Sequence, residues 1–187
     1  MVRTFISIDF DDQSVIKNIK EIQTKINSSG ALLKLVNPSI LHITIEFLGE
    51  ITENQIKDVK EILDSMEFPI FKLEVKNPNV LPTENYVRVV YCELNGDTEP
   101  LKQIQEKIRL KLKEKGFGVD KRSFKPHLTI ARVKSAKNRK ELISVIKELS
   151  AIYCGIQEIT SLKLKKSVLK PEGPEYSTLH VVKASSR

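Results

Sequence analysis

The sequence has little of what metal centres, membrane spans and nucleotide-driven enzymes require. It has two cysteines in 187 residues, and neither lies in a CxxC or Cys/His spacing typical of a metal site. No apolar run approaches the ~18 residues of a membrane-spanning helix. The chain also has no Walker-type GKS or GKT loop and no dinucleotide-binding glycine pattern, which disfavours ATP-driven chemistry. We therefore expect no metal, no cofactor and no membrane partner.

The two cysteines and the first strand indicate where the protein works. Cys92 and Cys154 lie in the apolar segments VVYCEL and AIYCGI, which is typical of buried free thiols in a reducing compartment. Asp9, Asp11 and Asp12 directly follow the first apolar segment, so no signal-peptide pattern of apolar region and cleavage site can be formed there. We expect a cytoplasmic protein.

Length and charge narrow the class of protein further. The composition, 40% hydrophobic and 29% charged, is that of a soluble globular protein, and 187 residues suffice for one sizeable core. We expect a single domain over residues 1–187 and a monomer. The net charge of +7 favours an anionic partner such as nucleic acid. Many lysines fall at exposed helix positions, however, so the charge alone does not locate a binding surface.

Hydrophobic periodicity predicts alternating strands and helices. The expected strands are 2–9, 31–36, 41–48, 70–80, 85–94, 126–133, 156–168 and 175–183. The expected helices are 12–28, one that begins at Thr52 with a capping box, one from about 97 to Gly116, and 137–149. No flexible linker separates the two halves, so we expect them to pack as one unit with a cleft between them.

A pattern of four residues occurs twice, once in each half. It reads HITI from His42 to Ile45 and HLTI from His127 to Ile130, in segments typical of buried strands. Side chains alternate between the faces of a strand, so each His shares a face with the Thr two positions later. The pattern thus presents two pairs, each with one imidazole and one hydroxyl.

A lone His on an apolar strand is most often a core residue with satisfied hydrogen bonds. The chain has three histidines, and chance places Thr two residues after two of them on the order of once in a hundred sequences. The doubling therefore favours a functional interpretation. The third histidine, His180, has no such Thr, and we interpret it as a structural or surface residue.

Two facing imidazoles and two hydroxyls are suited to phosphoryl chemistry. A neutral imidazole can take a proton from water, and a protonated one can give a proton to a departing sugar oxygen. The Thr hydroxyls can donate hydrogen bonds to phosphate oxygens, where negative charge accumulates. This scheme needs no metal and predicts a bell-shaped dependence of rate on pH.

At this point the residues resemble a known family. RTFISIDF at the start, LHITIEFLGE, the FKPH approach to the second motif in KPHLTIARV, and the late Tyr176 are similar to the two-histidine (2H) phosphoesterases, within them the RNA 2′,3′-cyclic phosphodiesterases or 2′-5′ RNA ligases of bacteria and archaea. The resemblance covers nearly the whole chain. It implies an α+β fold of two pseudo-symmetric lobes, each an antiparallel sheet backed by helices, with the active site in the cleft between them.

The resemblance also implies an activity and residue roles. The reaction would be hydrolysis of an RNA or nucleoside 2′,3′-cyclic phosphate to a 2′-phosphomonoester, with 2′-5′ ligation as related chemistry in vitro. His42 would be the proton donor, His127 the proton acceptor, and Thr44 and Thr129 would hold the phosphate. The two motifs are nearly symmetric, so this division between donor and acceptor comes from the resemblance.

Three further residues are singled out near the motifs. The resemblance implies that Arg132 contacts phosphate and that Phe5 lies near the base. Strict alternation turns Arg132 away from His127, so it reaches the site only if the strand ends or bulges, and otherwise it is a solvent-facing arginine. The same alternation places Glu46 on the face of His42, where it either tunes the imidazole or leaves the cleft and pairs with a lysine.

Two other functions compete with hydrolysis. The positive charge fits an RNA-binding module that has no turnover, although such a module needs no paired imidazoles. His42, His127 and Glu46 could alternatively form a two-His-one-carboxylate metal site. The Thr beside each His fits phosphate better than metal.

Overall fold

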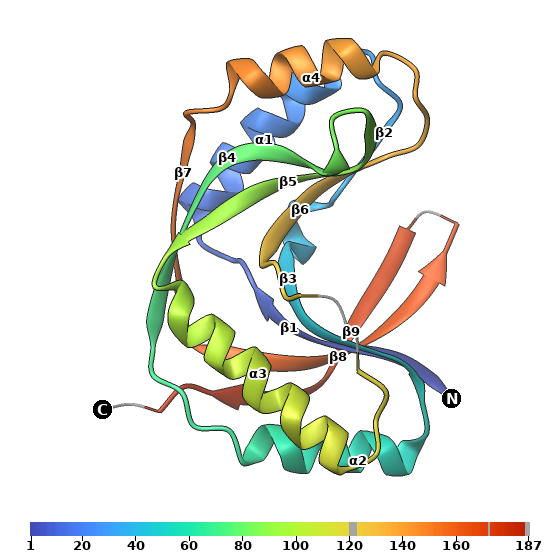
Figure 1. The fold of residues 1–187 in the computed structure, drawn as a ribbon, viewed down its shortest axis with the longest axis vertical. Coiled ribbons are helices and arrows are strands. Elements are labelled where there is room, and N and C mark those ends of the chain that lie inside the picture. The colour runs from blue at the N-terminus through green and yellow to red at the C-terminus, as the bar shows by residue number, and fades with distance from the viewer. Residues whose placement is uncertain (120–122, 172, 186–187) are drawn as a thin grey trace.

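The computed structural model describes residues 1–119, 123–171 and 173–185. In these residues two antiparallel sheets lie side by side with the helices on their outer faces (Figure 1). The helices are α1 (Gln13–Asn27), α2 (Glu53–Asp64), α3 (Thr98–Glu114) and α4 (Arg139–Glu148), with the short 3-10 turn η1 (Pro38–Ile40). The strands are β1 (Val2–Asp9), β2 (Leu33–Leu35), β3 (His42–Ile51), β4 (Phe71–Thr83), β5 (Tyr86–Gly96), β6 (His127–Val133), β7 (Tyr153–Ile159), β8 (Ser161–Lys170) and β9 (Gly173–Lys183).

Each sheet with its helices forms one lobe. Sheet A has the strand order β3-β1-β8-β9, and sheet B has the order β2-β6-β5-β4-β7. Helix α2 packs on β8 and β9, and α3 packs on α2 and β3, so both cover sheet A. Helix α1 packs on β6 and β7 of sheet B and against α4. The predicted α+β fold of two lobes, each an antiparallel sheet backed by helices, is confirmed.

The lobes are not the two halves of the sequence, and that part of the expectation is wrong. The first and last strands, β1, β8 and β9, lie in sheet A with β3, while sheet B takes β2 and β4 to β7. The chain therefore passes repeatedly from one lobe to the other, as the mixed colours of each sheet show (Figure 1). Because each lobe is built from distant segments, neither lobe is a continuous piece of the chain.

The expected single strand over 156–168 is also corrected. It is two strands, β7 and β8, which belong to different sheets and meet at Thr160. The carbonyl of Thr160 accepts a hydrogen bond from the backbone N–H of Ala184 at 2.8 Å. Buried apolar residues recur on both sides of this point, so periodicity does not reveal the change of sheet.

The helices form where their apolar stripes and caps predict. In α1, Val15, Ile19, Ile22 and Ile26 recur at helical spacing and are all buried in the core. Thr52 caps α2 in a complete capping box, which satisfies backbone N–H groups that the first turn cannot pair.

Both His-x-Thr strands contain a β-bulge at the same place. In β3 the extra residue is Ile45, because Thr44 pairs with one residue of β1 and Glu46 with the next. In β6 the extra residue is Ile130, by the same shift against β5. In each strand the bulged isoleucine and the residue after it are both buried, which breaks the in-out alternation. This shared irregularity relates the two motifs structurally.

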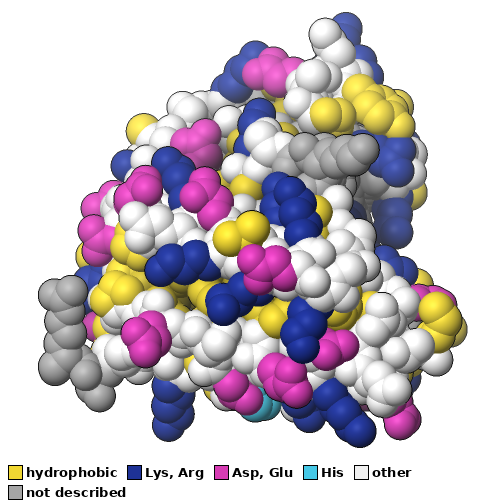
Figure 2. Space-filling model, turned by 60° about the horizontal axis from the view of Figure 1, so that its bottom comes forward, with side chains coloured by type: hydrophobic (Ala, Val, Ile, Leu, Met, Phe, Trp, Pro, Cys, Tyr) yellow, Lys and Arg dark blue, Asp and Glu magenta, His cyan; other side chains and the backbone are white. Residues whose placement is uncertain are grey.

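The remaining expectations concern thiols and charge. Cys92 and Cys154 are both free and buried, as predicted. Within the described ranges, no helix combines the length and apolar character needed to span a membrane. Figure 2 shows basic and acidic side chains interspersed on the face where α2 and α3 lie. On that face the positive charge forms no single-sign patch.

Candidate active site

The two motifs come from different sheets and meet between the lobes. His42 is the first residue of β3 in sheet A, and His127 is the first residue of β6 in sheet B. The strands β3 and β6 contact each other (Figure 1). We call the region formed by His42, Thr44, His127 and Thr129 the interlobe site.

Both imidazoles are held in the same way. His42 Nδ1 lies 2.8 Å from the carbonyl oxygen of Ile40, and His127 Nδ1 lies 2.7 Å from that of Lys125. A carbonyl oxygen only accepts, so each Nδ1 is the donor and carries a hydrogen. In the neutral ring this tautomer leaves Nε2 as the atom that takes a proton, and in the charged ring Nε2 is the atom that can give one.

Aromatic rings surround His42 more closely than His127. The ring centroid of His42 lies 5.1 Å from that of Phe5 and 5.2 Å from that of Tyr176. His127 has the edge-on ring of Tyr91 at 5.7 Å. Burial lowers the pKa of His42 below its ordinary value. The positive charges of nearby lysine and arginine side chains lower this pKa further, while the hydrogen bond to Ile40 opposes the shift.

The histidine of each His-x-Thr motif lies opposite a carboxylate on the neighbouring strand. Asp9 on β1 is the cross-strand partner of His42, and Glu93 on β5 is that of His127. Cross-strand partners share a face, so each lobe contains the same cross-strand pair of a histidine and an acidic residue.

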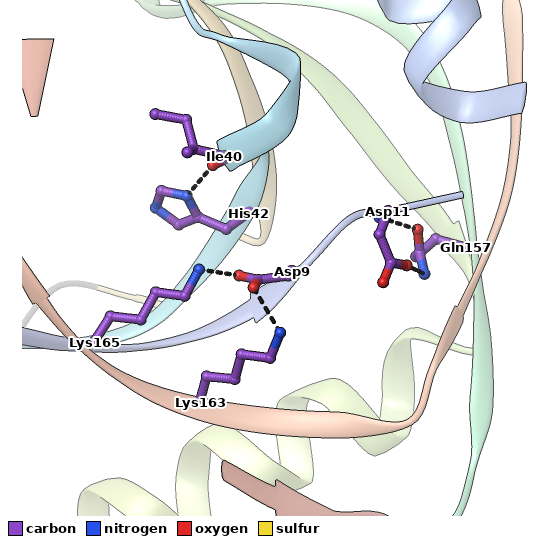
Figure 3. A network of polar contacts seen from close by, with 7 residues as sticks. All are labelled: Asp9, Asp11, Ile40, His42, Gln157, Lys163 and Lys165. Atoms are coloured by element: carbon purple, nitrogen blue, oxygen red, sulfur yellow. Dashed lines mark hydrogen bonds and ion pairs between the residues drawn. The ribbon is translucent and has the colours of Figure 1, made fainter. Parts of the chain in front are cut away.

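The groups that hold the two acids differ in charge. Asp9 accepts from the ammonium groups of Lys163 and Lys165 at 2.8 and 2.5 Å (Figure 3). Glu93 accepts instead from the neutral amides of Asn77 and Asn79 at 3.2 and 3.0 Å. The residues that hold the acid beside His42 therefore carry more positive charge than those that hold the acid beside His127.

The lysines also determine the charge state of Asp9. Burial alone would raise the pKa of this carboxyl group. The hydrogen bonds and charges of Lys163 and Lys165 outweigh burial, and the pKa of Asp9 lies below its ordinary value. Asp9 is thus an anion at neutral pH, and it is held by two cations.

The bulge in β6 decides the position of Arg132. Strict alternation would turn it away from His127, but the extra residue Ile130 returns it to the same face. Arg132 is exposed, and its charge acts on the pKa values of both His42 and Tyr176. The condition that the strand must bulge is met, and Arg132 belongs to the interlobe site.

The matching bulge in β3 removes Glu46 from the site, so its predicted place on the face of His42 is wrong. Glu46 is 3% exposed and points toward α3. It accepts hydrogen bonds at 3.1 Å from Gln105 and from the guanidinium of Arg109. The partner is therefore an arginine, where the sequence suggested a lysine. The residue that the bulge brings to the His42 face in its place is Phe47, whose exposed fraction is 59%.

Phe5 lies beneath the surface of the site. It is 3% exposed and packs between the rings of His42, Phe47 and Tyr176, with centroid distances of 5.1 to 6.1 Å. Its most direct effect is therefore to support the imidazole of His42.

The structure places two other candidate residues, His180 and Glu46, away from the interlobe site. His180 pairs with Asp64 of α2 at 2.6 Å, on the helix side of sheet A, in agreement with a structural role. Glu46 lies on the opposite face of β3 from His42, so it cannot complete a two-His-one-carboxylate metal site. Among the described residues no three His, Cys, Asp or Glu side chains are grouped to hold a metal.

Sequence reasoning missed the cluster of Asp9, Lys163 and Lys165. A signal was present, because Lys163 and Lys165 are two apart in the strand LKLKKS and therefore share a face. Asp9 likewise follows Phe5 at even spacing on β1. What the sequence lacks is any indication that β1 and β8 are neighbours.

An α+β fold of two related lobes, each of which contributes one His-x-Thr strand to a shared site, defines the class of two-histidine phosphoesterases. The comparisons agree. A family model described as the AKAP7 2′5′ RNA ligase-like domain matches residues 4–183. The chain belongs to this 2′-5′ RNA ligase-like family of 2H phosphoesterases.

Individual relatives cover nearly the full chain. An RNA 2′,3′-cyclic phosphodiesterase of Methanocaldococcus jannaschii is 35% identical over 180 residues, which are 95% of this chain and 98% of the relative. The protein of that name from Aeropyrum pernix is 32% identical over 172 residues, 92% of this chain and 98% of its own. A crystal structure of a Thermus thermophilus protein superposes with a TM-score of 0.81 at 25% identity, covering 97% of each chain.

Proposed function

We propose that this protein hydrolyses the 2′,3′-cyclic phosphate of an RNA end or nucleoside to a 2′-phosphomonoester by metal-independent acid–base catalysis. The observation that carries the proposal is the matched pair of imidazoles, one per lobe, each with Nδ1 committed to a backbone carbonyl. The names of the relatives support the choice of substrate. Two buried free thiols support a cytoplasmic setting, and we propose that the protein acts there as a monomer.

The proposed reaction is one concerted displacement. His127 Nε2 takes a proton from water, and the water oxygen attacks phosphorus opposite the 3′-oxygen. The bond between phosphorus and the 3′-oxygen breaks, and that oxygen receives a proton from His42 Nε2. The products are a 2′-phosphate and a free 3′-hydroxyl, with His42 neutral and His127 protonated until they exchange protons with solvent.

The other site residues act on the phosphate and on His42. Thr44 and Thr129 share the faces of their histidines and can donate hydrogen bonds to the non-bridging oxygens. Arg132 adds a positive charge beside them. Phe5 lies beneath the surface and supports the imidazole of His42. With an RNA 5′-hydroxyl in place of water, the same displacement joins two RNAs through a 2′-5′ linkage.

Product analysis tests the proposal directly. RNA with a 2′,3′-cyclic phosphate end, incubated with the protein in EDTA, is expected to yield only the 2′-phosphate, since a proton transferred to the 3′-oxygen releases that oxygen. Binding of the RNA without conversion would favour the RNA-binding module. Conversion only after Mn²⁺ or Zn²⁺ is added would contradict a metal-independent reaction.

The lowered pKa of His42 leads to a second prediction. In the free protein His42 is expected to titrate below the ordinary imidazole value of about 6.5. An anionic phosphate beside the ring favours its charged form, so adenosine 2′-phosphate should raise this pKa and bind more tightly as the pH falls through it. NMR titration of the histidine signals with and without the nucleotide measures both. A pKa that the nucleotide lowers or leaves unchanged would place the phosphate away from His42.

A further inference from the structure

The floor of the site beside His42 contains a nearly buried ammonium group, that of Lys165. Its side chain is 8% exposed, and its one hydrogen bond within the described part of the chain is to Asp9. An ammonium has three N–H donors, and an unsatisfied donor in a buried place costs free energy. Lys165 therefore has donor capacity that its surroundings leave for another acceptor.

Strand register places this ammonium on the face of the interlobe site. Lys165 is the cross-strand partner of Phe5, whose ring packs against His42. From there its stem runs along the sheet toward Asp9, the cross-strand partner of His42. Figure 3 shows the Lys165 ammonium close to both the Asp9 carboxylate and the His42 ring. Its charge is one of those that act on the pKa of His42.

Lys163 differs from Lys165 in position, although both bind Asp9. Lys163 donates to Oδ2 of Asp9 and Lys165 donates to Oδ1. The side chain of Lys163 is 26% exposed, so water screens its charge more strongly. Because the two cations hold a single anion, the cluster has one net positive charge, and Lys165 brings it closest to His42.

The net positive charge of the cluster complements the negative charge that the phosphate gains during the reaction. A cyclic phosphodiester carries one negative charge, whereas the phosphomonoester product carries up to two at neutral pH. A fixed cation in a poorly hydrated place stabilises the more negative state more strongly, which is the requirement for lowering a barrier. The equivalent place in the other lobe holds neutral amides beside Glu93, so the excess is specific to the lobe of His42.

We propose that Lys165 is a further catalytic residue, whose ammonium binds the substrate phosphate and stabilises the negative charge that develops as the bond to the 3′-oxygen breaks. Asp9 is the positioning residue that holds this ammonium in place. The proposal rests on the hydrolytic function proposed above.

The test compares Lys165→Met with Lys163→Met. Each change removes one of the two hydrogen bonds to Asp9 and keeps an apolar stem of similar length, so the two variants are matched in their effect on Asp9. With 2′,3′-cyclic AMP, Lys165→Met is expected to lower kcat/KM about 100-fold, the effect of losing one preorganised donor to a developing anion. Lys163→Met is expected to stay within about threefold of the unmodified protein.

Two readouts separate catalysis from folding. Thermal unfolding of both variants shows whether they fold, and NMR titration follows His42. Loss of the Lys165 cation should raise the pKa of His42 more than loss of Lys163 does, and should weaken binding of adenosine 2′-phosphate about tenfold. Equal losses of activity in the two variants, or an unchanged rate in Lys165→Met, would show that Lys165 only supports Asp9.

The design also distinguishes failure of the parent proposal. If the unmodified protein does not hydrolyse cyclic phosphates, the proposed function fails by itself. Nucleotide binding and the His42 titration then still decide whether Lys165 contacts the anion, since neither depends on turnover.

Discussion

Replacement of either His42 or His127 by alanine is expected to lower kcat for cyclic phosphate hydrolysis by about 10²–10⁴-fold. In the proposed mechanism each imidazole moves one of the two protons, and no other described titratable side chain is held in the same way at the interlobe site. The double variant should lose little more than the worse single variant, because the two groups act in one step. Steady-state kinetics with 2′,3′-cyclic AMP, with EDTA present, measures all three.

His180→Ala is the matched control for this prediction. It removes the third imidazole of the chain, which pairs with Asp64 on the helix side of sheet A. Its kcat is expected to stay within about twofold, because this half-buried imidazole contacts Asp64 on the helix side of sheet A and not the interlobe site. Substantial hydrolysis by His42→Ala or His127→Ala variants that still fold would rule out the two-histidine mechanism.

Arg109→Ala is expected to reduce the free energy of unfolding by about 3 kcal/mol, since it takes the guanidinium from a buried carboxylate. Glu46 is 3% exposed, and both Nε and an Nη of Arg109 contact its Oε2 at 3.1 Å. Glu46 comes directly after the bulge at Ile45 and faces α3, whereas Thr44 before the bulge faces the interlobe site. The ion pair therefore holds the strand of the first motif against α3. Urea unfolding followed by circular dichroism gives the value.

Lys115→Ala provides the comparison on the same helical surface. Lys115 forms ion pairs with Asp58 and Glu61 at 3.2 Å, and all three side chains are exposed. The expected loss is much smaller than that of Arg109→Ala, because solvent screens an exposed ion pair. If Arg109→Ala costs no more than Lys115→Ala, the ion pair to Glu46 does not stabilise the first motif.

The two pairs of imidazole and hydroxyl could be predicted from local sequence. The two His-x-Thr patterns place imidazole and hydroxyl on one face by strand alternation alone, and the structure holds both histidines by the same contact. The apolar stripe of α1 and the capping box at Thr52 were equally predictable, because helical spacing and capping depend on residues three or four apart.

The bulges lay beyond local reasoning. The local sequences ITIEF (43–47) and LTIAR (128–132) do not indicate an extra residue, because a bulge depends on how a strand pairs with its neighbour. Strict alternation therefore placed Glu46 on the face of His42 and turned Arg132 away from His127. In the tertiary structure Glu46 lies on the opposite face and Arg132 shares the face of His127. One inserted residue in each strand changes which side chains share the face of its histidine.

The sequence by itself predicted the two imidazoles and their hydroxyl partners, because these follow from the short-range geometry of a strand. Only the tertiary structure decided that the lobes are interleaved, that Arg132 enters the site while Glu46 leaves it, and that Lys165 lies beside His42. These outcomes depend on the pairing of β1 with β3 and β8 and of β6 with β5, and such contacts between distant segments follow from the burial of the whole core.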